Sequence, residues 1–275
     1  MTDGSGTGGS GTGGAATGGA GTGGAGTGGV GTGGVGTGGG RRARPVRVVV
    51  FDLDDTLVPQ AAWLAGAWEA VAAAAAEVGR DAGIEVDAGA LERALATDAG
   101  AGSARGGVID RAVAAVAPGL PVAPLVDAFR SYRAPRLVPF EGAVDAVQRC
   151  RRAVPVGLVT DGDPGIQRAK LSAAGLADAF DAVVFSDELG RERRKPHPLP
   201  FRTVLAALDA DPGDAAFVGD RPETDLAGAA ALGMTTVRVR TGEYAAVTGD
   251  VTPDADLPGV VEAVAWLLEV AVAAR

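Results

Sequence analysis

The stretch VRVVVFDLDDTL, residues 46–57, joins an apolar run to three carboxylates within four positions. Its first part, 46–52, is rich in β-branched residues, which is typical of a buried strand. Asp52, Asp54 and Asp55 follow directly. Carboxylates this close do not all stay ionised unless a cation lies between them or one is protonated. The stretch therefore predicts a core strand that ends in a cluster of acids in need of positive charge.

Short β-branched runs recur along the chain and alternate with Ala-rich segments of helical length. The further candidate strands are 154–160, 182–186, 215–220 and 235–240. The segment after the first of these has Asp163 as a helix N-cap and Pro164 at the first helical position. Gly175 is its stop signal. Near-continuous apolar strands that alternate with helices indicate a Rossmann-like α/β fold, in which a parallel sheet carries helices on both faces.

Residues 59–136 interrupt this alternation, because they contain no convincing strand. Their periodicity predicts helices over 60–82, 87–98, 106–117 and 122–132. We therefore expect an inserted all-helical cap domain at 59–136, with the catalytic core formed by 45–58 and 137–275. Further helices are expected over 139–152, which leads into the second strand, and over 258–274 at the end of the chain.

Residues 1–44 form a Gly- and Thr-rich segment, most of it a repeat of about five residues close to GTGGA. A segment with so little to bury is predicted to be a disordered linker. A spacer without specific function and a tether to a partner both fit this composition.

Bulk properties narrow the function classes. The net charge of −9 over 275 residues disfavours nucleic acid and anionic membranes as partners. No uninterrupted apolar run predicts a membrane span, and the N-terminus lacks the pattern of a secretory signal. Cys150 is the only cysteine, so no intramolecular disulfide forms, which favours a cytoplasmic location. His197 is the only histidine, which excludes multi-histidine metal sites. We expect the protein to be a monomer or a homodimer.

Ligands of an open parallel sheet bind beyond the carboxyl ends of its strands. At the first such end, Asp52 and Asp54 are two residues apart and should face the same way, whereas Asp55 should point elsewhere. Two facing carboxylates suit a hard cation such as Mg²⁺. The alternative is a solvated acidic turn or a helix N-cap.

Two other strand ends carry groups that suit an anion. Thr160 offers a hydroxyl, and the following Asp161 and Gly162 offer backbone N–H groups in a turn. Lys195 lies before a helix and can neutralise an anion or the acid cluster. A plain strand-to-helix turn is the alternative for the first group. A basic surface run is the alternative for Lys195, and the neighbouring His197 is interpreted as structural.

The fourth end places Asp220 after a strand and Asp225 at the start of the next helix, where both can reach a metal beside Asp52. A helix N-cap is the alternative for Asp225. Together the four ends describe a phosphoryl site with a nucleophile, a metal, oxyanion donors and positive charge.

These motifs resemble those of the haloacid-dehalogenase superfamily. DLDDT, residues 52–56, matches its DxDxT signature, and the helical insert resembles its helical cap of the first class. Thr160, Lys195, Asp220 and Asp225 match the remaining motifs. The resemblance covers about 46–245 and implies a phosphohydrolase; Asp161 stands where relatives often carry Asn.

The resemblance also implies a role for each matched residue. Asp52 is the nucleophile that forms an aspartyl-phosphate, and Asp54 is the general acid and then the base. Thr160 and Lys195 bind the phosphoryl oxygens, and Thr56 supports the first loop. The metal ligands are the Asp52 carboxylate, the Asp54 backbone carbonyl and Asp220, and Asp225 supports them.

The residues favour attack on phosphorus over displacement of a halide. Halide loss needs neither a proton for the leaving group nor a metal, so Asp54, Asp220 and Asp225 would be idle. A phosphate dianion needs the positive charge of a metal and a lysine. We expect a Mg²⁺-dependent phosphatase of a small phosphorylated metabolite. A phosphotransferase or sugar-phosphate mutase of the same family is an alternative, and a non-catalytic binding module is a weaker one.

Substrate specificity is expected from polar and aromatic residues of the cap. The candidates are Trp63, Trp68, Glu69, Arg105, Arg111, Tyr132 and Arg133. Solvated helix faces are the alternative for the polar members, and the two tryptophans fit a packed core better than a stacking platform.

Overall fold

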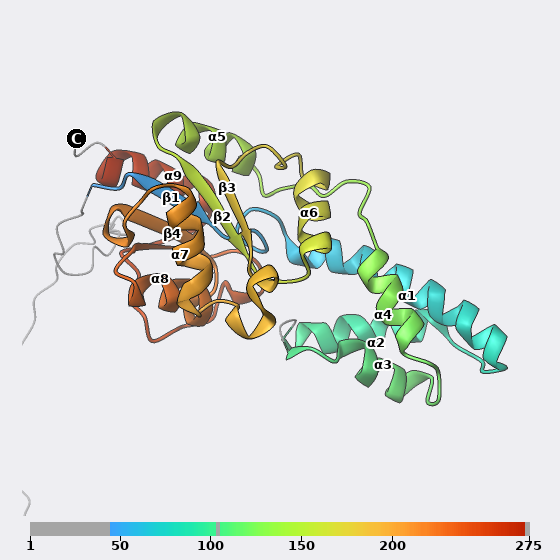
Figure 1. The fold of residues 1–275 in the computed structure, drawn as a ribbon. Coiled ribbons are helices and arrows are strands. Elements are labelled where there is room, and N and C mark those ends of the chain that lie inside the picture. The colour runs from blue at the N-terminus through green and yellow to red at the C-terminus, as the bar shows by residue number, and fades with distance from the viewer. Residues whose placement is uncertain (1–44, 103–104, 273–275) are drawn as a thin grey trace, which may run out of the picture. The chain divides into compact units, whose positions relative to one another are not determined.

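The computed structural model describes residues 45–102 and 105–272. The predicted linker 1–44 lies outside them. In the described residues six strands form one parallel sheet in the order β3-β2-β1-β4-β5-β6 (Figure 1). Their bounds are β1 Val48–Phe51, β2 Val156–Thr160, β3 Ala182–Phe185, β4 Ala215–Gly219, β5 Thr235–Val239 and β6 Ala255–Leu257. The α/β fold and the five predicted strands are confirmed, and the three-residue β6 was missed.

Strand order reverses at β1, which lies between β2 and β4. Phe51 is in register with Leu158 on one side and with Val218 on the other. The chain continues from Phe51 into Asp52, whose backbone N–H donates to Val218. Such a reversal leaves a crevice at the carboxyl ends of the two diverging neighbours, where open α/β sheets bind their ligands. The acid cluster therefore follows the strand that borders this crevice.

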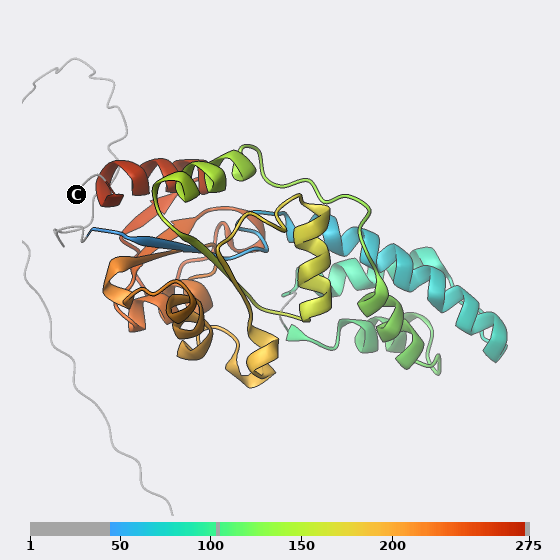
Figure 2. The ribbon, with the colours of Figure 1, turned by 45° about the horizontal axis from the view of Figure 1, so that its top comes forward.

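Helices cover both faces of the sheet, as predicted. On one face the side chains of β1 that include Phe51 pack with α5, Ala143–Ala153, and α9, Val260–Trp266. On the other face Val50 packs with α7, Pro198–Ala207, and α8 is Ala227–Ala231. Figure 2 shows the red α9 and green α5 on one side of the sheet, and the orange α7 and α8 on the other.

Both ends of helix α6 follow from the local sequence, whereas the helix at the end of the chain was predicted less accurately. Helix α6, Pro164–Ala173, begins at Asp163, whose side chain accepts hydrogen bonds from Gly165 and Ile166. Gly175 follows it with φ of 69°, a left-handed conformation that favours glycine. The predicted terminal helix over 258–274 is α9 followed by a π-helical segment, η7, Leu267–Val272.

Between β1 and α5 the described residues form four helices, close to their predicted bounds. They are α1 Gln60–Ala82, α2 Ala88–Gly100, α3 Val108–Val116 and α4 Ala123–Ser131. Their apolar faces share a hydrophobic cluster of their own, with Trp68, Leu91, Leu95 and Leu125 among its buried members. The division of the chain into core and cap at 58 and 136 stays a prediction. Across the described residues, no helix combines the length and hydropathy needed to span a membrane.

Candidate active site

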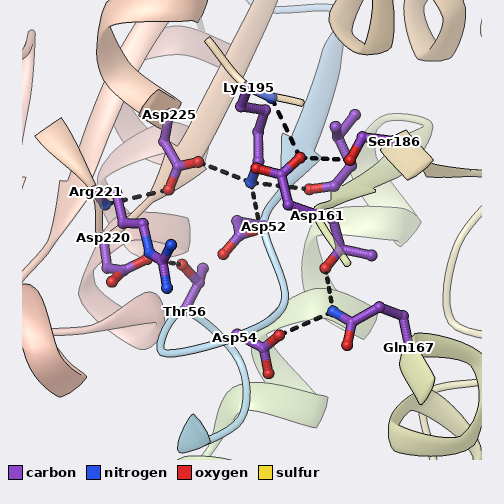
Figure 3. A network of polar contacts seen from close by, with 12 residues as sticks. Asp52, Asp54, Thr56, Asp161, Gln167, Ser186, Lys195, Asp220, Arg221 and Asp225 are labelled. Carbon is purple, nitrogen blue, oxygen red and sulfur yellow. Dashed lines mark hydrogen bonds and ion pairs between the residues drawn. The ribbon is translucent and has the colours of Figure 1, made fainter. Parts of the chain in front are cut away.

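The structure brings the predicted residues together beyond the carboxyl ends of β1, β2 and β4 (Figure 3). Asp52 follows β1, Thr160 ends β2, and Asp220 follows β4. Lys195 reaches them from the loop that precedes α7. All four are buried, none more than 6% exposed. Polar side chains this deeply buried are costly unless they pair, so their partners decide what the site can do.

Lys195 is the central cation of the site. Its Nζ lies 2.5 Å from Oδ1 of Asp52 and 2.7 Å from Oδ1 of Asp225. It also donates to the backbone oxygen of Val159 at 3.3 Å. Three protein oxygens therefore lie close to this one ammonium group. The alternative reading of Lys195 as part of a basic surface run is wrong, because its side chain is only 3% exposed.

Asp52, Asp220 and Asp225 form a buried carboxylate cluster. One oxygen of each lies within 4.8 Å of the others. Thr56 donates to Oδ1 of Asp220 at 3.4 Å, while Oδ2 of Asp220 is buried and accepts no hydrogen bond from any described residue. Three buried carboxylate oxygens with one lone acceptor fit a hard divalent cation. Lys195 and a bound cation would together supply the positive charge that this group of acids needs.

Asp225 reaches this cluster from a π-helical turn, η5, Pro222–Leu226. Its Oδ2 accepts a hydrogen bond from the backbone N–H of Arg221 at 3.2 Å. The alternative reading of Asp225 as a helix N-cap is wrong, because Arg221 holds the N-cap position of this turn.

Burial has a larger effect on the pKa values of Asp52 and Asp220 than any single neighbouring residue has. Burial raises the pKa of Asp52 to about 7, against the opposing effect of Lys195. Burial, with Asp225 and Asp52 adding to it, raises the pKa of Asp220 to about 9. Burial opposes the charge on Lys195, but Asp225 and Asp52 outweigh it and raise its pKa. The acids are therefore short of positive charge, which a divalent cation would supply.

Asp54 and Asp55 separate as the two-residue alternation predicts. Asp54 lines the same cavity as Asp52. The Asp55 carboxylate turns away and accepts hydrogen bonds from the backbone N–H groups of Gln60 and Glu243, at 2.9 and 3.1 Å. Asp55 therefore anchors the start of α1.

The turn after β2 is more occupied than the sequence suggests. The carboxylate of Asp161 accepts from Oγ of Ser186 at 2.6 Å and from the backbone N–H of Lys195 at 3.2 Å. The backbone of Gly162 hydrogen-bonds to Asp187 and helps to lower its pKa, after the larger effect of Arg194. The Asp161 side chain thus ties two loops together and offers no donor to an anion. Phosphate binding by Asp161 and Gly162 stays a prediction.

Several polar residues of the site escaped the sequence analysis. Gln167 and Lys170 reach Asp54 from α6, Ser186 follows β3, and Arg221 lines the cavity beside Asp220. A signal existed for the first two, because they are three residues apart and so share a face of a helix that starts at the sheet edge. Burial opposes the positive charge of Arg221, but the nearby Asp220 and Asp225 outweigh it and raise the pKa of Arg221.

A cavity of about 470 Å³ opens beside the carboxylates. Helices α1 and α4 contribute Trp63, Trp68 and Phe129 to its wall, and Arg130 adds a cation. Trp63 and Trp68 are 3% and 5% exposed and both pack on Phe129, so the prediction that they are core residues is confirmed. The same rings also border the cavity. Its volume suits a small molecule.

Comparison with known proteins extends this picture. The family model of haloacid dehalogenase-like hydrolases matches residues 46–233. The chain belongs to this family. Glyceraldehyde 3-phosphate phosphatase of Methanopyrus kandleri is 31% identical over 206 residues, which are 72% of this chain and 86% of that protein. Phosphoserine phosphatase of Thermus thermophilus is 42% identical over 114 residues, which are 42% of this chain and 45% of that relative. The chain thus matches less than half the length of the latter.

Solved structures of this hydrolase family share the fold. A 2-haloacid dehalogenase from Pseudomonas syringae aligns with a TM-score of 0.58 and 24% identity, over 81% of this chain and 98% of that one. A HAD phosphatase from Thermococcus onnurineus aligns with the same TM-score and 22% identity, over 82% and 99%. Fold similarity at this level does not separate the two chemistries, so the argument for one of them rests on the site.

Proposed function

We propose that this hydrolase is a Mg²⁺-dependent phosphatase that acts on a small phosphorylated metabolite through an aspartyl-phosphate. The observation that carries the proposal is the setting of Asp52. This residue directly follows β1, and its carboxylate contacts the buried Lys195 at 2.5 Å and belongs to a cluster with Asp220 and Asp225. A nucleophile for a phosphate dianion needs this combination, because attack brings two negative charges together.

Asp52 supplies the nucleophilic oxygen. As its bond to phosphorus forms, the bond between phosphorus and the leaving oxygen breaks, and Asp54 gives its proton to that oxygen. Asp54 then takes a proton from the water that attacks the aspartyl-phosphate, which releases inorganic phosphate and restores Asp52. Both acids line the same cavity, so they can act on the two ends of one breaking bond.

Thr160 and Lys195 bind the phosphoryl oxygens. Gln167 donates to Oγ1 of Thr160 at 2.5 Å, which leaves the Thr160 hydroxyl proton for a phosphoryl oxygen. Lys195 contacts the nucleophile itself and offsets the charge that accumulates around it.

Asp52, Asp220 and the backbone carbonyl of Asp54 would hold Mg²⁺, with Asp225 in support. Bound there, the ion supplies positive charge to the phosphoryl oxygens. The lone buried Oδ2 of Asp220 and the raised pKa values of Asp52 and Asp220 support this assignment.

Relatives that are named as phosphatases support this chemistry over halide displacement. Their names differ in substrate, so the substrate of this chain has to come from a screen of phosphorylated metabolites. The polar groups that border the cavity favour a small leaving group with oxygen functions.

The test is turnover of p-nitrophenyl phosphate and of a metabolite panel by the purified protein. We expect hydrolysis with Mg²⁺ and loss of activity with a chelator, restored by added Mg²⁺. Turnover that is unaffected by chelation contradicts the metal assignment. Inorganic phosphate as the only phosphorus product separates a phosphatase from a phosphotransferase or mutase, which would pass the phosphoryl group to a second alcohol.

A further inference from the structure

Asp54 is held by two side chains from one helix. Lys170 places its Nζ 2.6 Å from Oδ1, and Gln167 places its Nε2 2.8 Å from Oδ2. Each carboxylate oxygen thus has a donor of its own, from residues three positions apart on one face of α6. Figure 3 shows Gln167 pointing at Asp54. The same amide nitrogen also donates to Oγ1 of Thr160 at 2.5 Å.

Both donors are buried, which marks the arrangement as specific. Gln167 is 2% exposed and Lys170 is 4% exposed. A buried ammonium or amide is strongly disfavoured without partners. Lys170 has Asp54 and the face of the Trp63 ring, whose centroid lies 4.6 Å from Nζ. The nearby Arg168 differs, because its side chain is 56% exposed and pairs with Glu188.

We propose that Lys170 and Gln167 are positioning residues that fix the Asp54 carboxyl group for proton transfer to the leaving group. The inference rests on the proposed phosphatase function. Asp54 lies on a loop, and an unsupported carboxyl group there samples several rotamers. A displacement of about 1 Å in a reacting group can cost about 10² in rate.

The geometry also explains how the transfer ends. As the bond between phosphorus and the leaving oxygen breaks, the proton passes from Asp54 to that oxygen. The carboxylate that remains accepts hydrogen bonds from Nζ of Lys170 and Nε2 of Gln167 in the positions already observed. Because Gln167 also donates to Thr160, one amide aligns the acid with a phosphoryl-binding hydroxyl.

The experiment compares two leaving groups in Lys170→Met and Gln167→Leu variants with Mg²⁺ present. p-Nitrophenolate leaves with little help from a proton, whereas an alkoxide needs one. The value of kcat/KM covers the steps through release of the leaving group, so it excludes attack by water. We expect each variant to lose about 10²-fold or more in kcat/KM on an alkyl phosphate, and to lose much less on p-nitrophenyl phosphate.

Two further variants make the result specific. Asp54→Asn should give the same leaving-group pattern, and Asp54→Asn/Lys170→Met should be no slower on the alkyl phosphate than Asp54→Asn alone, because residues that act as a unit are not additive. Arg168→Met changes an exposed residue on the same helix, and its kcat/KM on both substrates should equal that of wild type.

Equal losses on both substrates in the two single variants, or additive losses in the double variant, overturn the inference and leave a structural role. Wild-type protein that hydrolyses neither phosphate overturns the proposed function and this inference together. Active wild-type protein with equal losses overturns the inference alone. Thermal melts of each variant separate misfolding from misplacement, and Gln167→Leu provides the test if Lys170→Met does not fold.

Discussion

Replacing Asp220 by Asn should stabilise the metal-free protein at alkaline pH. Folding raises the pKa of Asp220 from 3.8 to about 9, chiefly through burial. A carboxyl group whose pKa rises on folding favours the unfolded state increasingly as pH rises from about 4 to about 9, because the unfolded chain releases the proton first. At about 1.4 kcal/mol per pKa unit, this site costs on the order of 5 kcal/mol at pH 8, before structural relaxation reduces it. Asn carries no such proton.

The assay is urea unfolding at pH 5 and pH 8, with chelator and with Mg²⁺. In chelator, the stability of Asp220→Asn relative to wild type should rise by roughly 2–4 kcal/mol between the two pH values. Added Mg²⁺ should stabilise wild type more at pH 8 than at pH 5, because the ligands must be deprotonated to bind it. The variant should gain little from the ion.

Asp55→Asn is the matched control. Asp55 is also buried, but its carboxylate accepts hydrogen bonds from two backbone N–H groups. An amide cannot accept both with the same geometry, so this variant should lose about 1–3 kcal/mol at either pH. A relative stability of Asp220→Asn that does not change with pH, or an equal response of both proteins to Mg²⁺, refutes the reasoning.

Other predictions concern residues whose roles differ. Lys195→Met should lower kcat/KM on p-nitrophenyl phosphate by at least about 10², because the nucleophile loses its contact at 2.5 Å; activity within a factor of a few of wild type would argue against this role. Asp55→Asn should retain far more kcat/KM than Asp54→Asn on an alkyl phosphate, whose leaving group needs a proton, and similar losses would show that the alternation of the two side chains is irrelevant to catalysis. Cys150 should not react with a thiol reagent until the protein unfolds, because it is buried and burial raises its pKa to about 12; rapid labelling of the native protein contradicts its place in the core.

The sequence identified the strand ends because they combine two strong local signals. Apolar β-branched runs predict parallel core strands, and acids or hydroxyls directly after such runs stand out against them. Since the carboxyl ends of parallel strands share one edge, Asp52, Thr160 and Asp220 could be placed together without knowledge of the strand order. The order itself, with β1 between β2 and β4, is a property of the tertiary structure.

The features that escaped prediction depend on packing. Polar residues on a helix are usually solvated, so the spacing of Gln167 and Lys170 placed them on one helix face but did not indicate that this face is buried. The π-helical turn that carries Asp225 into the acid cluster has no distinctive sequence pattern. Strand β6 is only Ala255–Leu257, which is too short to predict from its composition. It is a strand because it pairs with β5.

The central claim is that Asp52 is the nucleophile, and trapping of the phospho-enzyme tests it most directly. Protein mixed with substrate and Mg²⁺ should be quenched in acid and analysed by mass spectrometry of its peptides. The account predicts that the peptide containing Asp52 gains one phosphoryl group in wild type and that Asp52→Asn gains none and has no turnover. Normal turnover by Asp52→Asn, or a phosphoryl group on a different residue, would contradict it.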